Sequence, residues 1–413
     1  MRDTYVDDCA TGAANDQDAE QLALDMNELL CKGGFTTKGY SFSRRPPPPA
    51  LTKDGESISV LGYKWFTVDD VLSIAFGTLC FAKKYRGKKQ VSADSHVIPE
   101  ELNRSICLGK VHELFDPCGL TAPIMGCFKI DLRNLFDGEL GWEDPISKED
   151  HDTWVKNFHL LVSIGQIRYS RTVVPENAEN LNVELLSAGD ASAKMTCAGC
   201  YVRFKLKDGS YSCQLVLGKT KIVPDGMTLP RAELMASVLN VHITEVVRRS
   251  LQEMVADKVF VTDSEIALHW MNSETKQLKP WVRNRVIEAN RFSMPENRFH
   301  IKSDMNTADI GTRKGVTLTD ISPGSEWVSG KPWMKLPVTE MRQQKVLSTV
   351  EDIKYRKEQL EEIKKEKISM STDLCDSGFI VMSKPVQEKG DGCFLVDKKV
   401  DSLLSEISIK AKE

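Results

Sequence analysis

The stretch that decides the fold is Lys258-Val259-Phe260-Val261-Thr262-Asp263-Ser264, an apolar run that ends on an aspartate and a serine. Its β-branched and aromatic residues favour a short buried strand. The pattern around it predicts, in order, strands 182–188, 195–206 and 210–223, a helix 230–249, strand 258–262, further helices, strand 298–302 and a helix opening near Asn306. This is an α/β order, so we predict an α/β domain over residues 181–316.

The composition sets wider limits. The chain has 413 residues, of which 41% are hydrophobic, enough for two or three packed domains. Its net charge of -4 does not indicate nucleic-acid binding, so any such contact must come from local basic patches. We find no signal peptide, no apolar run of membrane-spanning length and no repeated spacing among eleven cysteines. These features favour an intracellular, reducing setting without a membrane partner.

The first part of the chain has a different pattern. Alternation over 58–82 predicts a hairpin with its turn near Asp69 and Asp70. The basic cluster 83–89 fits a solvated loop and a phosphate contact equally well. Residues 99–173 are helical in pattern, and the prolines and glycine of 115–123 force a turn between two helical hairpins.

Two further segments have alternative interpretations. Cys197 and Cys200 form a CxxC, but no second CxxC or His pair lies at zinc-site spacing, which favours buried strand cysteines over a metal site. The Lys- and Glu-rich residues beyond about 338 predict an exposed or disordered tail with one helical piece near 350–368.

Four carboxylates occupy the ends of predicted elements in the α/β domain. Asp190 ends the first strand, Glu233 lies at the start of the helix, Asp263 follows the central strand and Asp309 opens the last helix. Strand ends and helix starts meet at one edge of a sheet, so these side chains can converge. Each could instead be a surface group or a helix cap, as Asp263 beside Ser264 illustrates.

Such a carboxylate cluster is suited to phosphodiester hydrolysis. That reaction needs the phosphate charge neutralised, a water activated and the leaving oxygen stabilised, which two Mg²⁺ ions can do together. Mg²⁺ prefers oxygen ligands, and Mn²⁺ accepts the same ligands. We therefore predict a site for two Mg²⁺ or Mn²⁺ ions.

At these positions the sequence resembles the Pol polyprotein of BEL/Pao-type retrotransposons, in the region named the Pao retrotransposon peptidase family. The matching segments are Gly189-Asp190-Ala191-Ser192, Leu229-Pro230-Arg231-Ala232-Glu233-Leu234, Val261-Thr262-Asp263-Ser264 and 306–313, with 281–285 and 327–333 flanking them. The family usually has proline where Thr307 stands and an aromatic residue where Gly39 stands. The missing proline relaxes the backbone before Asp309.

The resemblance extends to the first residues. Tyr5-Val6-Asp7-Asp8 resembles the reverse-transcriptase palm motif, and 61–65 resembles the hairpin that grips the primer end. Residues 115–123 and 141–145 resemble thumb and connection segments. The implied organisation is a partial palm with primer-grip hairpin (1–82), a helical thumb or connection (83–180), a ribonuclease H-like α/β domain with a mixed sheet (181–316), and a linker with a charged, partly disordered tail (317–413).

The resemblance implies endonucleolytic cutting of the RNA strand of an RNA/DNA hybrid. Asp190, Glu233 and Asp263 would hold one metal ion, and Asp190 with Asp309 the second. Asp7 and Asp8 would be half of a polymerase metal site, so we expect no nucleotide incorporation by this chain alone. The candidate nucleic-acid-binding residues are Lys64, Trp65, Lys88, Lys89, Lys194 and Arg231.

Several alternatives remain open at this stage. The chain could be a domesticated or decayed remnant that binds nucleic acid or protein without cutting, or Met1 could be a gene-model start inside a longer polyprotein. His300 could resemble the mobile histidine that assists product release in many ribonucleases H, but a strand end is the simpler interpretation. The peptidase name would need Asp376-Ser377-Gly378, whose setting in the charged tail argues against proteolysis. Expected partners are the hybrid and other Pol parts, in cytoplasm, virus-like particle or nucleus.

Overall fold

The computed structural model describes most of the chain, in these ranges: 4–5, 8–9, 11–13, 15–37, 39–51, 57–82, 84–85, 88–89 and 91–368. Asp7 and the Asp376-Ser377-Gly378 tripeptide lie outside the described residues. For Asp8, Lys88 and Lys89 the structure describes only the backbone, in the two-residue strands β2 (Asp8–Cys9) and β7 (Lys88–Lys89). Their partner strands are β1 (Thr4–Tyr5) and β6 (Lys84–Tyr85).

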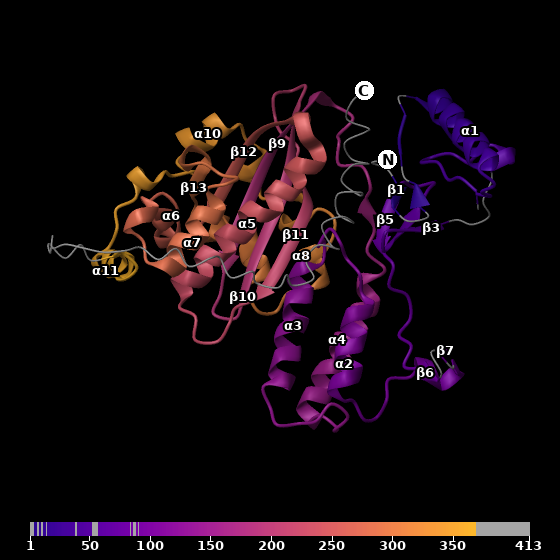
Figure 1. Ribbon diagram of the computed structural model, residues 1–413, viewed down its shortest axis with the longest axis horizontal. Coiled ribbons are helices and arrows are strands. Elements are labelled where there is room, and N and C mark those ends of the chain that lie inside the picture. Colours follow the sequence, from indigo (N-terminus) through magenta and orange to yellow (C-terminus); the bar gives the residue numbers. More distant parts are fainter. Residues whose placement is uncertain are drawn as a thin grey trace, which may run out of the picture.

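A five-stranded mixed sheet forms the largest part of the molecule (Figure 1). Its order is β11-β10-β9-β12-β13, with bounds β9 (Ala178–Ala191), β10 (Met195–Leu206), β11 (Gln214–Ile222), β12 (Val255–Thr262) and β13 (Arg298–His300). The first three strands pair antiparallel, whereas β12 pairs parallel with both β9 and β13. The predicted α/β order with a mixed sheet is confirmed.

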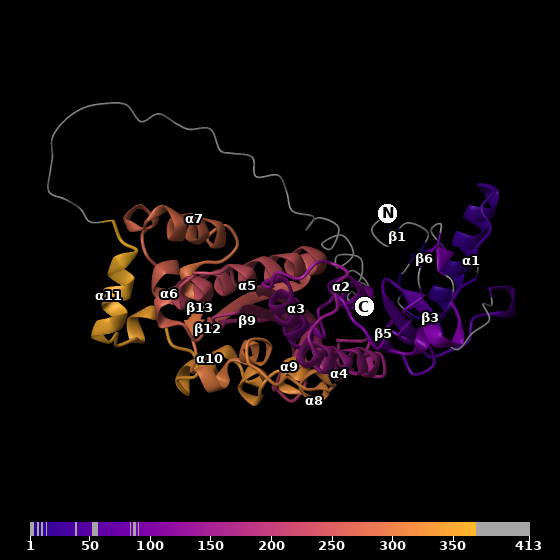
Figure 2. The same cartoon turned by 90° about the horizontal axis from the view of Figure 1, so that it is seen from below.

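Helices cover both faces of this sheet. One face carries α5 (Leu229–Leu251), which begins with a proline in its first turn, and α7 (Pro280–Ala289), while α6 (Glu265–Met271) follows β12. The other face carries α8 (Leu318–Ile321), α9 (Glu326–Ser329) and α10 (Val338–Gln343) (Figure 2). Because both faces are covered, β10 is buried along nearly its whole length rather than alternating between buried and exposed residues.

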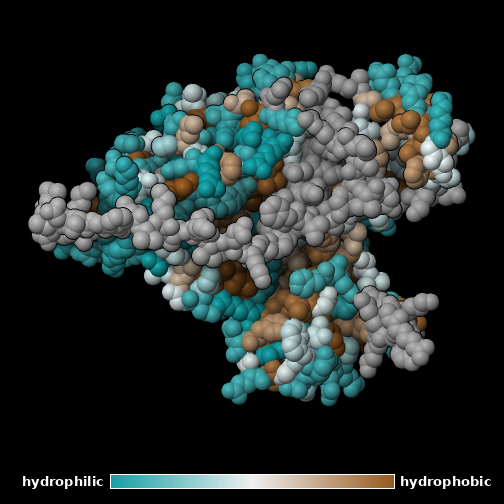
Figure 3. Space-filling view, viewed as in Figure 1, coloured by the Kyte–Doolittle hydropathy of each residue, from teal (hydrophilic) through white to brown (hydrophobic). Residues whose placement is uncertain are grey.

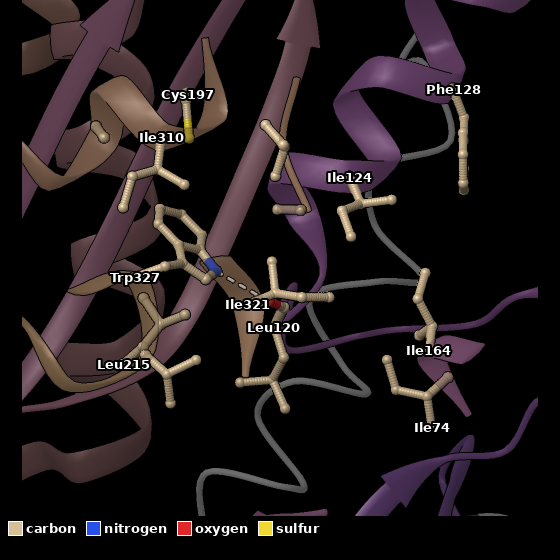
Figure 4. Close-up of a cluster of buried hydrophobic side chains, with 14 of the residues drawn as sticks. Ile74, Leu120, Ile124, Phe128, Ile164, Cys197, Leu215, Ile310, Ile321 and Trp327 are labelled. Carbon is tan, nitrogen blue, oxygen red and sulfur yellow. Dashed lines mark hydrogen bonds between the residues drawn. The ribbon is translucent and has the colours of Figure 1, made fainter. Parts of the chain in front are cut away.

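Residues 317–368 differ from the linker expected there. Besides α8 to α10 they include α11 (Lys357–Lys365), which packs against α6. Trp327 is fully buried, and its indole Nε1 donates a hydrogen bond to the Leu120 carbonyl oxygen at 2.9 Å (Figure 4). These short helices fill the second face of the sheet, so the packed unit continues well past residue 316.

Three helices lie between the hairpin and the large sheet: α2 (Arg104–Glu113), α3 (Ala122–Phe136) and α4 (Lys148–Ile164). The turn expected at 115–123 is present between α2 and α3. Two helical hairpins would need four helices, and the described residues 99–173 contain three. Residues 137–147, with two glycines and a proline, form the connection between α3 and α4, and residues 169–170 join a sheet as β8 (Tyr169–Ser170). Side chains of α3, including Ile124 and Phe128, extend the core toward the hairpin (Figure 4).

The N-terminal part contains α1 (Asp16–Lys32) and a sheet of order β3-β4-β5-β8, with β3 (Ser57–Val60), β4 (Tyr63–Phe66) and β5 (Val71–Ile74). The turn predicted near Asp69 and Asp70 is confirmed. Asp70 has a φ of 53°, and its buried carboxylate receives hydrogen bonds from Arg171 at 2.5 and 2.9 Å. This ion pair ties the hairpin to the segment that enters the large sheet.

Short 3₁₀ turns connect these elements: Pro49–Leu51, Ala93–His96, Gln252–Met254, Thr275–Gln277, Pro295–Asn297, Ser303–Met305, η7 (Thr307–Gly311), Pro332–Lys335 and Val350–Asp352. Within the described ranges, no helix is long and apolar enough to cross a membrane.

Candidate active site

Two of the four predicted carboxylates lie side by side at one edge of the large sheet. The parallel register of β9 and β12 places Thr262 opposite Gly189, and the next residues along the two strands are Asp263 and Asp190. Neighbouring strands are about 4.8 Å apart, so these two acids face the same small region. Asp190 is only 9% exposed.

Glu233 joins them from α5. The Ser264 hydroxyl donates to Glu233 Oε2 at 2.5 Å, which links the helix to the residue after Asp263. The helix can approach this closely because Gly189 has no side chain: a Cβ there would lie 3.0 Å from the Ala236 carbonyl oxygen.

Asn240, two turns further along α5, holds the helix to both strands. Its side-chain amide donates to the backbone oxygens of Ser187 at 3.1 Å and Val261 at 3.4 Å. Asn240 is buried, so these bonds fix the position of α5 and therefore of Glu233.

Asp309 lies in η7, where a longer helix was expected. The Asn306 side chain accepts a hydrogen bond from the Ala308 amide at 3.1 Å and so begins the turn with threonine rather than proline at position 307. Gly311 lies against β10, since a Cβ there would be 2.2 Å from Cys197 Sγ. This contact keeps the segment close to the strand that pairs with Asp190.

Three polar side chains from residues 303–312 hold the strand-end acids. The Asn306 amide donates to Asp263 Oδ1 at 3.1 Å and to the Gly189 carbonyl at 3.1 Å. The Ser303 hydroxyl donates to the other oxygen of Asp263, and the Thr312 hydroxyl donates to Asp190 Oδ2. The segment that carries Asp309 therefore also orients the two acids at the sheet edge.

The electrostatics show that neighbouring acids act on Asp190 and on Glu233. Burial, together with repulsion by Asp263 and Asp309, raises the pKa of Asp190 to about 7, against the opposing effect of the Thr312 hydrogen bond. Burial also raises the pKa of Glu233 to about 7, with a smaller contribution from Asp263 and an opposing one from the Ser264 hydroxyl. A cation at this edge would relieve that repulsion.

The donor set consists of carboxylate oxygens, which suits a hard cation such as Mg²⁺ or Mn²⁺. In the part of the chain that the structure describes, no group of three or more His, Cys, Asp or Glu side chains is arranged closely enough to hold a metal ion. Asp263 and Asp309 thus lie near enough to Asp190 to raise its pKa, while the described side chains do not form a closed set of ligands.

The other predicted binding residues are distributed differently. Lys194 is exposed in the turn between β9 and β10, four residues after Asp190 in the sequence. Arg231 forms an ion pair with Glu366 at 2.6 Å and stacks over the Trp281 ring at 4.9 Å, so its charge is already paired.

The hairpin residues lie apart from this edge, to the right of the large sheet in Figure 1. Lys64 is exposed, whereas Trp65 donates from Nε1 to Asp70 Oδ1 at 3.1 Å. The guanidinium of Arg171 also lies over the Trp65 ring, 5.4 Å from the ring centroid. Trp65 therefore has a structural role in the turn, and Lys64 is not part of the acid cluster.

His300 lies at a strand end and the two cysteines are buried in a strand, which are the simpler of the interpretations given for them. His300 ends β13, its backbone bridges to Ser348, and burial lowers the pKa of its ring. Cys197 and Cys200 are buried free thiols in β10, as expected for strand cysteines.

Sequence reasoning missed the hydroxyl and amide groups that hold the acids: Ser264, Ser303, Asn306 and Thr312. Ser264, Asn306 and Thr312 lie within the family-like segments, so their nearness to acids was a usable signal. Ser303 lies outside those segments and reaches Asp263 only through the fold, 40 residues away along the chain.

Comparison with known proteins supports part of the predicted relationship. Residues 103–264 match the family described as the Pao retrotransposon-like RNaseH-like domain. This range includes Asp190, Glu233 and Asp263 but ends before Asp309. No curated protein matches the chain.

Solved structures give weaker likenesses. One is the N-terminal RNase H domain of a Mycobacterium tuberculosis protein fused to maltose-binding protein, with 15% identity and a TM-score of 0.23 over 31% of this chain and 89% of that chain. Another is the foamy viral protease-reverse transcriptase dRH in complex with double-stranded DNA, with 11% identity and a TM-score of 0.28. The match to the foamy viral protein covers 61% of this chain and 38% of that one.

Proposed function

Because residues 103–264 match the Pao retrotransposon-like RNaseH-like domain family, we propose that the chain hydrolyses the RNA strand of RNA/DNA hybrids at the Asp190 edge of its sheet. The observation that carries this proposal is the register of β9 and β12, which brings Asp190 and Asp263 together at adjacent strand ends. Glu233 is held beside them through Ser264.

The donor chemistry suits two divalent cations. Asp190, Glu233 and Asp263 would hold one, and Asp190 with Asp309 the other. When bound, the two ions supply neutralisation of the phosphate charge, a water that is nucleophilic near neutral pH and stabilisation of the leaving 3′ oxygen. The chain's uncharged polar groups have another role. Thr312, Ser264 and Asn306 donate hydrogen bonds to the carboxylates and so orient them toward the ions.

Selectivity for RNA would come from the shape of the hybrid. The chemistry at phosphorus is the same for DNA, so discrimination requires contacts to 2′-hydroxyl groups across the wide minor groove. Lys194, exposed in the turn after Asp190, would contact the backbone on one side of the cleavage point.

We also propose that residues 1–82 are a partial reverse-transcriptase palm with a primer-grip hairpin, and that 83–180 are its thumb or connection. The hairpin supports this assignment, because the pairing of β3 with β4 places 61–62 at a tight turn and 63–65 at the start of β4. The Tyr63 hydroxyl donates to Asp116 Oδ1 at 2.6 Å, which connects the hairpin to the turn between α2 and α3. Asp7 and Asp8 would be two carboxylates of a polymerase site that needs a further aspartate.

The test is cleavage of a panel of substrates by the purified chain with Mg²⁺. An RNA/DNA hybrid labelled on the RNA strand, the same sequence as duplex DNA, and the single-stranded RNA are incubated in parallel. We expect cutting of the hybrid alone, with internal RNA products. Hybrid binding without metal-dependent cutting would instead support a non-catalytic remnant, and equal cutting of single-stranded RNA would refute the assignment.

A further inference from the structure

The docked segment, residues 357–368, comprises α11 and the three residues after it. α11 lies beside α6 (Figure 2), and Ile363 is its buried residue. After the helix, the Glu366 carbonyl oxygen accepts a hydrogen bond from the Lys279 amide at 2.8 Å. The face formed by α5 and α7 is mainly hydrophilic (Figure 3), so polar contacts, rather than a broad apolar surface, hold the segment in place.

An ion pair joins the docked segment to the start of α5. Arg231 lies in the first turn of this helix, two residues before Glu233. It donates to Glu366 Oε1 from Nε at 2.8 Å and from Nη2 at 2.6 Å. Glu366 is only 7% exposed, so solvent and salt screen this pair less than they screen a surface ion pair. The first turn of α5 is therefore attached to the segment by a buried, two-pronged contact.

The start of α5 has little support of its own. Thr228, the residue before the helix, makes no side-chain cap hydrogen bond within the described part of the chain. The first amides of a helix have no partners inside it, so an uncapped start frays easily. Asn240, which holds α5 to the strands, lies about two turns beyond Glu233, or about 10 Å along the helix axis. The ion pair therefore holds the end of α5 that Asn240 does not reach.

A second contact joins the docked segment to α6. Gln359 Nε2 donates to Glu265 Oε2 at 2.5 Å, and Glu265 is the first residue of α6. The residue before it is Ser264, whose hydroxyl accepts from the Ala267 amide at 3.1 Å. That hydroxyl also donates to Glu233 Oε2 at 2.5 Å. The same side chain thus caps α6 and holds Glu233, and the segment is attached directly beside it.

We propose that the docked segment holds the start of α5 against the start of α6 and so sets Glu233 beside Asp263, an inference that rests on the proposed function. Glu366 and Gln359 are then positioning residues, because each acts through a partner that adjoins the contact between the two helix starts. A displacement of about 1 Å caused by a remote change can lower a rate by about 10²-fold, so such support matters for a carboxylate that receives a cation.

A purely structural role makes a different prediction. The segment would then only cover α6 and α7, and the loss of either contact would lower the melting temperature. The folded protein would still bind Mg²⁺ and cut hybrid as the wild type does, because Glu233 would be held by Ser264 and Asn240 without help from the segment.

The experiment uses the full chain, at a temperature well below the melting point of every variant. Calorimetry without hybrid measures Mg²⁺ affinity, and hybrid cleavage gives kcat and KM separately. Glu366→Gln removes the charge with little change of shape, and Gln359→Leu removes the amide. Glu362→Gln is the matched control, because Glu362 lies on the same helix and pairs at 2.8 Å with Lys365 of that helix.

We expect Glu366→Gln and Gln359→Leu each to weaken Mg²⁺ binding about 10-fold, the lower end of the cost of losing a group that orients a metal ligand. Glu362→Gln should leave the affinity unchanged. At a fixed Mg²⁺ concentration kcat should fall by a similar factor with KM for the hybrid unchanged, because neither side chain belongs to the proposed substrate-binding surface. Hydrogen exchange in the first two turns of α5 should be faster in Glu366→Gln than in Glu362→Gln.

A double-mutant cycle shows whether Glu366 acts through Arg231. If it does, Arg231→Gln and Glu366→Gln weaken Mg²⁺ binding by the same factor, and the double variant binds no more weakly than either single variant. Measuring without hybrid keeps any contact between Arg231 and nucleic acid out of the result. Factors that multiply in the double variant would overturn the proposal.

Three outcomes separate this inference from the proposed function. If wild type cuts the hybrid and Glu366→Gln matches it in Mg²⁺ affinity and kcat, the positioning role is overturned and the nuclease assignment stands. If wild type binds Mg²⁺ in a Glu366-dependent way but cuts no hybrid, the proposed function fails and the positioning of Glu233 is upheld. If wild type neither binds Mg²⁺ nor cuts hybrid, both are overturned.

Discussion

Trp327 gives the sharpest test of how far the packed unit extends. Its side chain is fully buried between the sheet and the turn before α3, and its Nε1 donates to the Leu120 carbonyl at 2.9 Å (Figure 4). The ring lies against Gly199 and Gly218, where an added Cβ would be 3.1 and 2.5 Å away from ring carbons.

Trp327→Ala should lower the free energy of unfolding by about 3 to 5 kcal/mol, the usual cost of removing a large buried aromatic side chain. Of this, about 1 kcal/mol comes from the hydrogen bond to Leu120. Trp327→Phe keeps most of the ring and should cost less, about 1 to 3 kcal/mol, because the Leu120 carbonyl loses its donor.

The assay is urea unfolding followed by far-ultraviolet circular dichroism, which does not depend on tryptophan fluorescence. Trp142→Ala is the control, since Trp142 is 57% exposed and contacts mainly Phe136, an edge-on aromatic pair with centroids 5.2 Å apart. Its loss should cost about 1 kcal/mol. A cost for Trp327→Ala no larger than for Trp142→Ala would refute the conclusion that residues beyond 316 belong to the domain.

Two other predictions concern hydrogen bonds and burial. Thr312→Val removes the hydroxyl that donates to Asp190 and should lower hybrid cleavage by about 10 to 100-fold with an unchanged circular dichroism spectrum; cleavage at the wild-type rate would show that Asp190 needs no such support. Burial raises the pKa of Asp131, so the folded state holds its proton more tightly, and stability is lost as the pH rises from about 3.8 through the folded pKa. Asp131→Asn should therefore raise the melting temperature relative to wild type more at pH 7 than at pH 3.5, and an equal difference at both pH values would contradict this reasoning.

The local pattern of the sequence was enough to predict the centre of the domain. The run ending at Asp263 forms β12, the helix with a proline in its first turn forms α5, and the mixed sheet has the predicted strand order along the chain. Asp190 and Asp263 lie close together because their strands pair in parallel, an arrangement that an α/β order favours. These features depend on short-range periodicity, which the sequence shows directly.

Features that depend on contacts between distant segments were not predictable in this way. Trp327 lies in a four-residue helix with no useful periodicity, and its partner Leu120 is 207 positions earlier. Arg231, which we predicted to bind nucleic acid, pairs with Glu366 at a separation of 135 positions, a contact that the sequence did not indicate. Residue type and local pattern do not reveal which charges a fold brings together.

Asp309 shows an intermediate case. The sequence predicted that a helix begins near Asn306, three residues before Asp309. The threonine at position 307, in place of proline, predicted a looser backbone before Asp309. The structure forms a short 3₁₀ turn capped by the Asn306 side chain rather than a longer helix. The same asparagine also holds Asp263, a second role that its place in the sequence did not indicate.

The most direct test of the central claim is the initial rate at which wild type and Asp263→Asn cut the RNA strand of a hybrid with Mg²⁺. Asp304→Asn is the matched control, an exposed aspartate in the 3₁₀ turn Ser303–Met305, next to the serine that donates to Asp263. We predict a loss on the order of 10³-fold for Asp263→Asn and a change of less than about twofold for Asp304→Asn. Equal rates for wild type and Asp263→Asn, or no cutting by either, would contradict the assignment of this edge as a nuclease site.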